Sequence, residues 1–490
     1  MTRKSLFLRR TVLPLLLAFG ALGAVQAIAA DLKPCHPPGM RDAAQCGVLK
    51  RPLNPSEPNG KQIDVHYVVV ASMAREKHPD PVFFFAGGPG QSAIDVLPAI
   101  IGSLKRLNNR RDIVFVDQRG TGTSAPLQCA PDASVPLRES MDPQLLAKRM
   151  ERCRLALEKL PYGDLRFFTT SIAMGDIDAV RAALGAETIN LIGGSYGTRA
   201  ALEYMRLYPQ RVRRVVLDGV VPPDLSLPQS ISEDANSALK ALFADCAADK
   251  ACNANYPNLA QTWESLFDRL PATMLMDNPV TGTPEQVTIT APMIGLMVRG
   301  PLYAPNMASA LPRAIAEAAQ GRWGAMMGLA SASGNRSGKE MAMGMHFSTL
   351  CAEDALRPVS LESAGRFSNA MELSYKAVCA DWPKGQVDPA FYVTPKTTSP
   401  VMMLSGGIDP VTPPQHAQKT AKLLGDTVEH IIVPKAGHGL LRLGCVRDLV
   451  FRFVDSKAPP VPDPKKADCL ATIPRPMAFV PMAVQMRGAK

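Results

Sequence analysis

A short glycine-rich segment between two regular patterns limits the fold of this 490-residue chain more than any other feature. The segment is 193–197, with the sequence GGSYG, which has the form G-x-S-x-G. It follows 189–192, a mostly apolar segment predicted to be a strand, and precedes 199–207, where the spacing is helical. Because glycine allows the backbone to turn sharply, the pattern predicts a strand, a tight turn that exposes the Ser195 hydroxyl, and a helix.

Other parts of the chain repeat this alternation of apolar runs and helical spacing. Short, unbroken apolar runs indicate strands covered on both faces, and 171–184 fits a helix that ends at Gly185. Alternating strands and helices predict an α/β fold with a mainly parallel sheet and helices on both of its faces. The predicted strands are 63–70, 82–85, 113–116, 189–192, 212–217, 401–404 and 430–433.

The pattern changes between 222 and 398, where helical stretches are interrupted by Pro, Gly and Asn. A helical insertion that divides a sheet predicts a cap over the carboxyl ends of the strands, where open α/β sheets place their sites. The predicted organisation is a signal peptide at 1–30, a first core part at 31–221, the cap at 222–398, a second core part at 399–475 and a tail at 476–490.

Two downstream residues complete a candidate catalytic group with Ser195. Asp409 follows the strand 401–404, and His438 lies between two glycines after the strand 430–433. A serine hydroxyl needs a base at neutral pH, and the order serine, acid, histidine is that of the α/β-hydrolase fold. We therefore expect Ser195 as nucleophile, His438 as its base and Asp409 as the residue that orients the base. The alternative for His438 and Asp409 is a role in turns alone.

Backbone N–H groups near Ser195 are expected to bind the negative oxygen of an acyl-transfer transition state. One is that of Tyr196, and the other belongs to Gly87 or Gly88, in the loop after the strand 82–85. Pro89 is excluded because it has no N–H. The sequence has no phosphate loop, dinucleotide fingerprint or cysteine and histidine metal pattern, so we expect neither cofactor nor metal.

The first thirty residues have the features of an export signal, with a basic start, an apolar stretch at 12–24 and small residues at 27–29. A retained membrane anchor is the alternative. All ten cysteines follow this segment, which predicts disulfides and a periplasmic or extracellular location, with no membrane span after removal of the signal. The expected pairs are Cys35 with Cys46, Cys129 with Cys153, Cys246 with Cys252, Cys351 with Cys379, and Cys445 with Cys469.

The net charge of +10 does not indicate a nucleic-acid partner. Four cations and no acids lie in the leader, so the remaining chain carries +6, with its cations mixed among acids. Such mixing is typical of a solvated surface. The sequence does not indicate an oligomeric state.

Five blocks together resemble the secreted prolyl and tripeptidyl aminopeptidases, α/β-hydrolase serine peptidases related to the proline iminopeptidases. The last part of the chain is similar to the C-terminal region of the tripeptidyl branch. The resemblance implies a peptide substrate with a free N-terminus, whose amine is bound by carboxylates of the cap or a loop. Glu353 is the first candidate and Asp354 the second, with an acidic surface beside a disulfide as the alternative. The blocks are 87–92, 117–124, 176–181, 193–198 and 407–413.

The substrate is less constrained than the reaction. Ala86 stands where the iminopeptidases commonly have histidine, which argues against strict specificity for proline. The same three residues would also hydrolyse carboxylic esters or other small acyl compounds. A binding protein that keeps the fold without turnover is a third hypothesis, and the intact order of Ser195, Asp409 and His438 argues against it.

Overall fold

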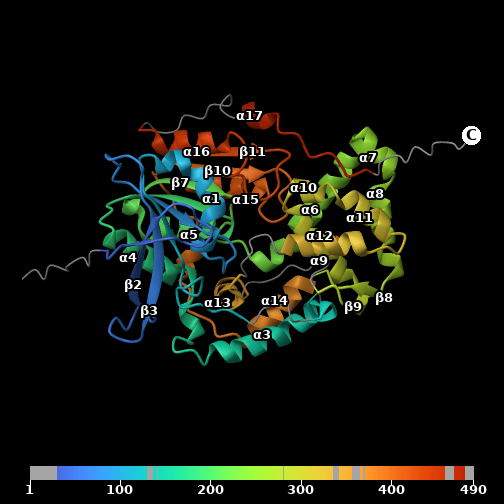
Figure 1. The fold of residues 1–490 in the computed structure, drawn as a ribbon, viewed down its shortest axis with the longest axis horizontal. Helices are drawn as coiled ribbons and strands as arrows, with labels where there is room; N and C mark the ends of the chain where they lie inside the picture. Colours follow the sequence, from blue (N-terminus) through green and yellow to red (C-terminus); the bar gives the residue numbers. More distant parts are fainter. Residues whose placement is uncertain are drawn as a thin grey trace, which may run out of the picture.

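The computed structural model describes residues 30–129, 136–140, 142–279, 281–334, 341–355, 365–367, 370–457 and 468–480. The predicted signal peptide, apart from Ala30, and the last ten residues of the predicted tail lie outside these ranges. Figure 1 shows a sheet with flanking helices on one side of the molecule and a group of helices from the middle of the chain on the other. None of the described helices is both long enough and apolar enough to cross a bilayer.

A nine-stranded sheet forms the core, in the order β1-β2-β3-β5-β4-β6-β7-β10-β11 (Figure 1). From β5 to β11 in this order all neighbours pair in parallel, whereas β1, β2, β3 and β5 pair antiparallel at one edge. The strands are β1 (Lys33–Cys35), β2 (Ala44–Pro52), β3 (Gln62–Val70), β4 (Val82–Phe85), β5 (Ile113–Val116), β6 (Ile189–Gly194), β7 (Val212–Asp218), β10 (Val401–Gly406) and β11 (Val428–Val433).

All seven predicted strands are present in this sheet, as β3 to β7, β10 and β11. The strands β1 and β2, at the edge of the sheet, were not predicted. Only two of the nine residues of β2 are buried, and its polar and apolar residues do not form the continuous run that marks an interior strand. The fold is therefore the predicted α/β arrangement with an added antiparallel edge.

Helices cover both faces of the sheet, and alternate residues of each strand face opposite layers. Phe83 and Phe85 pack in the layer that contains α4 and α5, while Phe84 packs in the layer that contains α1 and α16. The helices outside the cap are α1 (Ala93–Asn108), α2 (Leu137–Ser140), α3 (Pro143–Leu157), α4 (Thr170–Ala183), α5 (Tyr196–Leu207), α15 (Pro414–Leu424), α16 (Val446–Asp455) and α17 (Asp468–Ala471).

The cap is mostly helical, as expected, and has a hydrophobic cluster of its own that includes Trp263, Ile294 and Met326. The cap also contains an antiparallel hairpin of β8 (Ala272–Asp277) and β9 (Pro284–Ile289), which the sequence did not predict. The cap helices are α6 (Leu227–Ala248), α7 (Lys250–Asn255), α8 (Leu259–Ser265), α9 (Ala291–Leu302), α10 (Pro305–Ala308), α11 (Leu311–Ala318), α12 (Gly324–Gly334), α13 (Met343–Glu353) and α14 (Ala370–Asp381).

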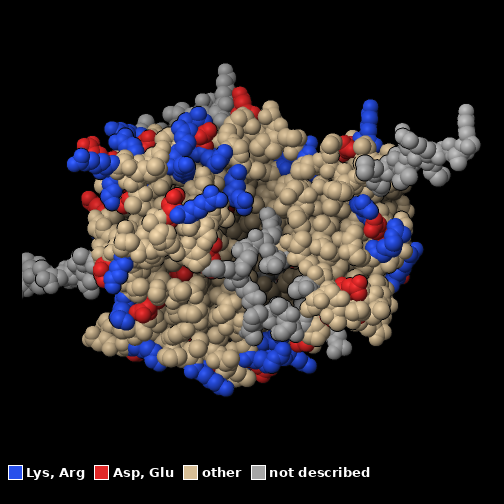
Figure 2. All heavy atoms as spheres, viewed as in Figure 1, with Lys and Arg blue, Asp and Glu red and all other residues tan. Residues whose placement is uncertain are grey.

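Two helices of the insertion, α13 and α14, pack against the core. Phe347 and Cys351 of α13 and Cys379 of α14 belong to the hydrophobic cluster of the core, together with Phe168 and Leu157. One part of the insertion therefore packs within the cap, and another part packs against the core. Figure 2 shows the face of the molecule hollowed near its centre, with Lys and Arg mixed among Asp and Glu around it.

All ten cysteines form disulfides, in the five expected pairs. Cys351–Cys379 joins α13 to α14, and Cys445–Cys469 joins α16 to α17. Disulfides stabilise a fold mainly by restricting the unfolded chain, and they persist in oxidising compartments. Export is consistent with this number of cross-links.

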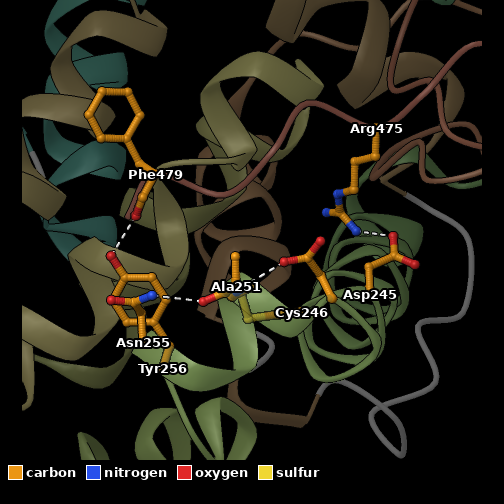
Figure 3. Close-up of a disulfide and its surroundings, with 9 residues drawn as sticks. Asp245, Cys246, Ala251, Asn255, Tyr256, Arg475 and Phe479 are labelled. Atoms are coloured by element: carbon orange, nitrogen blue, oxygen red, sulfur yellow. Dashed lines mark hydrogen bonds and ion pairs between the residues drawn. A yellow bond between two sulfur atoms is a disulfide. The ribbon is translucent and has the colours of Figure 1, made fainter. Parts of the chain in front are cut away.

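The C-terminal segment 472–480 runs from the core to the cap, close to the disulfide between α6 and α7 (Figure 3). Arg475 forms an ion pair with Asp245 of α6, and the Tyr256 hydroxyl donates to the carbonyl of Phe479. The Phe479 N–H donates to the Ser309 carbonyl at 2.9 Å. The described part of the predicted tail therefore packs on the cap.

Candidate active site

Ser195 lies on the turn between β6 and α5, with φ 55° and ψ −126°, a conformation that non-glycine residues rarely adopt. Thr198 holds this turn, because its N–H and its hydroxyl donate to the Ser195 carbonyl at 2.8 and 2.6 Å. A Cβ at Gly197 would lie 2.2 Å from the Phe85 carbonyl oxygen, so only glycine fits there. The predicted strand, turn and helix are present, with Ser195 at the carboxyl end of the sheet.

His438 and Asp409 are in direct contact at the same end of the sheet. His438 Nδ1 lies 2.8 Å from Asp409 Oδ2. The Thr412 hydroxyl donates to the same oxygen at 2.7 Å, while the N–H groups of Val411 and Thr412 donate to Oδ1 at 2.9 Å each. Four polar contacts therefore fix the buried carboxylate in front of the imidazole. The role of Thr412 was not predicted, although this residue lies in the block 407–413.

Burial and the ion pair act in opposite directions on both groups. Burial alone would lower the pKa of His438, but the charge and the hydrogen bond of Asp409 raise it, and the net direction is upward. Burial alone would raise the pKa of Asp409, but His438 and the Thr412 donors lower it, and the net direction is downward. Asp409 is thus ionised at neutral pH and stabilises a proton on His438.

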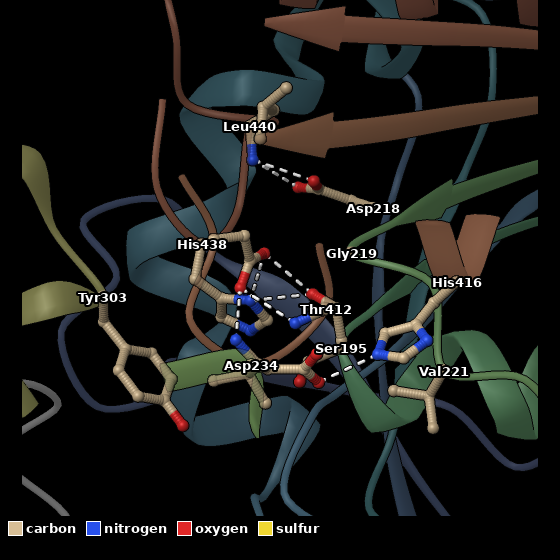
Figure 4. Close-up of polar contacts among 12 residues, drawn as sticks. Ser195, Asp218, Gly219, Val221, Asp234, Tyr303, Thr412, His416, His438 and Leu440 are labelled. Carbon is tan, nitrogen blue, oxygen red and sulfur yellow. Dashed lines mark hydrogen bonds and ion pairs between the residues drawn. The ribbon is translucent and has the colours of Figure 1, made fainter. Parts of the chain in front are cut away.

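A short chain of contacts connects Ser195 to this pair. The Ser195 N–H donates to the Asp218 carbonyl at 2.8 Å, and the next residue, Gly219, lies against His438 and Thr412. Figure 4 shows Ser195 in the same cluster as His438 and Thr412. Within the described part of the chain, the Ser195 hydroxyl and the imidazole are not hydrogen-bonded to each other. Such bonds are commonly long in ligand-free hydrolases and shorten when substrate binds.

The cap contacts the imidazole directly through Tyr303, which follows α9. The Tyr303 carbonyl accepts the backbone N–H of His438 at 2.9 Å, and the two rings meet edge to face with centroids 5.2 Å apart. The position of the histidine therefore depends on the cap as well as on the sheet. No sequence pattern signals this contact, since the two residues are far apart along the chain.

The glycine-rich loop after β4 carries the candidate oxyanion donors. The Gly87 N–H donates to Gln91 Oε1 at 3.2 Å, whereas the Gly88 N–H has no partner among the described residues. Tyr196 is the first residue of α5, where backbone N–H groups have no partner within the helix. Tyr196 and Gly88 are therefore the two unoccupied donors of the predicted set.

Side chains on both sides hold this loop in place. His346 of α13 contacts the Pro89 carbonyl through Nδ1 at 2.9 Å and the Tyr375 hydroxyl through Nε2 at 3.0 Å. Burial lowers the pKa of His346 to about 4, so the ring is neutral at pH 7 and its Nδ1 donates to the carbonyl. At the other end of the loop, the buried Asp117 carboxylate accepts the Ser92 hydroxyl at 2.6 Å.

Residues 80–442 match the family model of the α/β hydrolase fold, a range that includes Ser195, Asp409 and His438. The chain belongs to the α/β-hydrolase family.

Curated relatives of this α/β hydrolase include peptidases and an esterase. Serine protease Hip1 of Mycobacterium tuberculosis is 29% identical over 316 residues, which cover 59% of this chain and 58% of that protein. Tripeptidyl aminopeptidase of Streptomyces coelicolor is 32% identical over 193 residues, 36% of this chain and 35% of that protein. Carboxylesterase B of M. tuberculosis is 26% identical over 461 residues, 85% of each chain. The resemblance seen in the sequence is confirmed at the level of hydrolase relatives.

The two carboxylates predicted to bind the amine are both buried in this α/β hydrolase. Asp354 forms an ion pair with Arg199 at 3.1 Å, with both side chains fully buried. Glu353 accepts the Thr170 N–H at 2.7 Å and the Thr170 hydroxyl at 2.9 Å. Burial raises the pKa of Glu353 to about 8, although Arg199 opposes this shift. Asp354 therefore already has a cationic partner, and the Glu353 oxygens are occupied.

A third carboxylate, which was not predicted from the sequence, is Glu372 of α14. It is 5% exposed, it bonds to Ser232 of α6, and its Oε2 has no hydrogen-bond partner in the described structure. Arg299 of α9 is close enough to lower the pKa of both Glu372 and His438, so the carboxylate and the imidazole lie near the same cation. Burial raises the pKa of Glu372, as expected for a carboxylate without a bound cation.

Replacing Gly219 with alanine is expected to displace the base. A Cβ there would lie 2.8 Å from Thr412 Oγ1 and 3.2 Å from His438 Cε1, at a φ of +74°. We expect kcat/KM to fall by about 10- to 100-fold, because small displacements of a catalytic group cost rates of this order. Gly185→Ala is the matched control, since Gly185 has a φ of +70° and an added Cβ there would meet nothing within 4 Å. Equal activity of the two variants would contradict the assigned position of His438.

No group of three or more His, Cys, Asp or Glu side chains is arranged to hold a metal ion in the described ranges. The polar groups that converge on Ser195 are those of acyl transfer: a hydroxyl, an imidazole with an aspartate behind it, and backbone N–H groups.

Proposed function

We propose that the chain is an exported serine hydrolase that releases residues or short peptides from the free N-terminus of peptides. The observation that carries the proposal is the 2.8 Å contact between His438 Nδ1 and Asp409 Oδ2, next to the strained turn of Ser195. An aspartate at Nδ1 keeps the proton on that nitrogen, which leaves Nε2 free to act as a base. The similarity to a serine protease and a tripeptidyl aminopeptidase supports a peptide substrate.

In the proposed reaction, His438 Nε2 takes the proton of the Ser195 hydroxyl while the serine oxygen attacks the substrate carbonyl. Asp409 stabilises the resulting imidazolium, and the N–H groups of Tyr196 and Gly88 donate to the oxyanion. The imidazolium then gives its proton to the leaving amine, and the acyl group stays on Ser195. Water, activated by the same imidazole, releases it.

Two observations support export. The five disulfides are of the kind that persists in the periplasm or outside the cell. The sequence before Ala30 has the composition of a signal peptide. Expression of the full chain in a bacterium, followed by fractionation and N-terminal sequencing, tests this part of the proposal. A chain that keeps Met1 and stays in the cytoplasm would contradict it.

For the substrate amine we propose Glu372, with Glu353 as the second candidate, in place of Asp354. A protonated amine in an apolar cleft needs a paired anion. Glu372 has a buried oxygen without a partner among the described residues, whereas the oxygens of Glu353 accept the two donors of Thr170. The ion pair with Arg199 removes Asp354 from consideration.

The amine requirement is tested with one chromogenic tripeptide amide in free and N-acetylated forms. Acetylation is expected to lower kcat/KM by about 10²- to 10⁴-fold, because it leaves a buried carboxylate without its partner. Glu372→Gln is expected to lower kcat/KM for the free peptide, which reduces the difference in kcat/KM between the free and acetylated forms. Glu353→Gln is the paired variant. If this difference is reduced in Glu353→Gln but not in Glu372→Gln, the amine is assigned to Glu353. Equal turnover of free and acetylated peptides would contradict the aminopeptidase proposal.

A carboxylesterase or another small-acyl hydrolase is the second candidate, supported by the match to carboxylesterase B over 85% of the chain. The catalytic groups are the same, so only the substrate differs. Short-chain p-nitrophenyl esters and the free tripeptide amide, compared by kcat/KM, separate the two. Turnover of esters with none of the peptides would favour the esterase.

A further inference from the structure

A residue outside the proposed triad connects its nucleophile to its base. Asp218 is the last residue of β7, and its backbone carbonyl accepts the Ser195 N–H at 2.8 Å. The Asp218 side chain points away from Ser195, toward the loop that follows His438 (Figure 4). There the Leu440 N–H lies 2.8 Å from both carboxylate oxygens, and the Leu441 N–H lies 2.9 Å from Oδ2.

The carboxylate of Asp218 holds this loop at a high desolvation cost. It is 4% exposed and forms no ion pair with a Lys or Arg within the described ranges. A buried carboxylate without a cation is unfavourable, and an amide or a hydroxyl would accept the same two N–H groups with a smaller penalty. We therefore expect the negative charge of Asp218 to have a role beyond accepting these two N–H groups.

The charge acts on the base. The charged groups that face Asp218 are His438, on the loop it holds, and Asp409, on the loop after β10. The negative charge of Asp218 raises the pKa of His438, as that of Asp409 does. A proton taken by His438 from the nucleophile is thus stabilised from two sides.

We propose that Asp218 is a positioning residue that fixes the His438 loop to the Ser195 turn and acts as a second anion for the protonated imidazole. The inference rests on the proposed roles of Ser195 and His438. Asp218 touches neither substrate nor the reacting atoms, so its contribution belongs to kcat and to the pH dependence of activity.

The pH dependence follows from two groups that must both lose a proton. His438 must be neutral to act as a base, and its pKa is raised above its ordinary value. Burial raises the pKa of Asp218 to about 6, although the Leu440 and Leu441 N–H groups and His438 oppose the shift. Below pH 6, Asp218 takes up a proton and can no longer accept both N–H groups as an anion. With a short-chain ester, which has no amine for Glu372 to bind, the acid limb of log kcat/KM should therefore approach a slope of two below pH 6.

The test compares wild type, Asp218→Asn and a matched control over pH 4.5 to 9. Asp80→Asn is the control, because Asp80 is also a buried aspartate, 6% exposed, but bonds to Arg111 away from the site. We expect Asp218→Asn to lose about 10- to 100-fold in kcat with little change in KM, because the amide still accepts the two N–H groups but no longer stabilises the protonated imidazole. Its acid limb should have a slope of one, while the Asp80→Asn limb keeps the wild-type slope.

Three results would overturn the inference. The first is an Asp218→Asn enzyme with wild-type kcat, and the second is one whose acid limb still has a slope of two. The third is a wild-type slope of one down to pH 4.5, with circular dichroism showing that the enzyme is folded. If Asp218→Asn fails to fold, the slope of the wild-type acid limb alone tests the inference. A wrong assignment of the triad can be distinguished from a wrong role of Asp218, because Ser195→Ala would then retain activity.

Discussion

Replacing Ser195 with alanine is expected to lower kcat by about 10⁵- to 10⁶-fold on any substrate that the enzyme accepts, the loss typical of a serine nucleophile. The expected loss is this large because the Ser195 hydroxyl is the proposed nucleophile of the covalent intermediate, and no other nucleophile among the described residues lies on the strained turn. Backbone donors and substrate binding are retained, so a small residual rate above the uncatalysed reaction is expected. Steady-state kinetics on the best peptide or ester measures the effect.

Ser399→Ala is the matched control for this experiment. The Ser399 hydroxyl donates to the Val212 carbonyl at 2.9 Å, just before β10 and so at the opposite end of that strand from the site. We expect this variant to keep kcat within about twofold of wild type, as surface and structural substitutions away from a site do. A Ser195→Ala enzyme as active as Ser399→Ala would refute the proposed nucleophile.

Asp409→Asn has the second largest expected effect, and its cause is the tautomer of His438. The N–H groups of Val411 and Thr412 both donate to Oδ1, so the amide oxygen of an asparagine takes that place. The amide NH₂ then faces His438 Nδ1, which must become an acceptor. The proton of His438 then moves to Nε2, so Nε2 can no longer accept the proton of the Ser195 hydroxyl. We expect a loss of about 10⁴-fold in kcat at neutral pH.

A second histidine and aspartate pair nearby supplies the control. His416 Nε2 lies 2.8 Å from Asp234 Oδ2, in a pair that joins α15 to α6, and Asp234 is 3% exposed. Asp234→Asn makes the same chemical change in a similar environment without touching the proposed base. A loss of less than about tenfold is expected, since breaking one buried pair outside the machinery acts mainly on stability. Similar losses in both variants would mean that the Asp409 result reports packing, not the tautomer.

The parts of the molecule that were predicted from sequence are those encoded by short segments. The interior strands are short and mainly apolar, without a break in β4 and β5, and each proposed catalytic residue follows such a strand. The order of strands along the chain then brings their carboxyl ends to one edge of the sheet. Cysteine pairing was predictable for the same reason, because the partners are 6 to 28 residues apart.

What was missed depends on contacts between distant segments. Arg199 and Asp354 are 155 residues apart, and nothing local to either reveals that they form a buried ion pair. The resemblance therefore offered Asp354 as a candidate for the substrate amine without revealing its partner Arg199. Asp218 was hidden for a similar reason, because its role depends on Leu440 and Leu441, 222 and 223 residues away.

The cap shows the same limit on a larger scale. The hairpin of β8 and β9 alternates exposed and buried residues, with Met276, Val287 and Ile289 buried, and its strands are short and polar on one face. Such strands give a weaker signal than the interior ones. The packing of α13 with the core depends on Phe168 and Leu157, which precede it by almost two hundred residues.

The measurement that tests the proposed nucleophile most directly is labelling of the folded enzyme with a fluorophosphonate, followed by intact mass and peptide mapping. We expect one adduct per chain, on Ser195, with no adduct in Ser195→Ala and much slower labelling in Asp409→Asn. An unlabelled wild type, or labelling of Ser195→Ala at the wild-type rate, would contradict the assignment of Ser195, His438 and Asp409 as a catalytic triad.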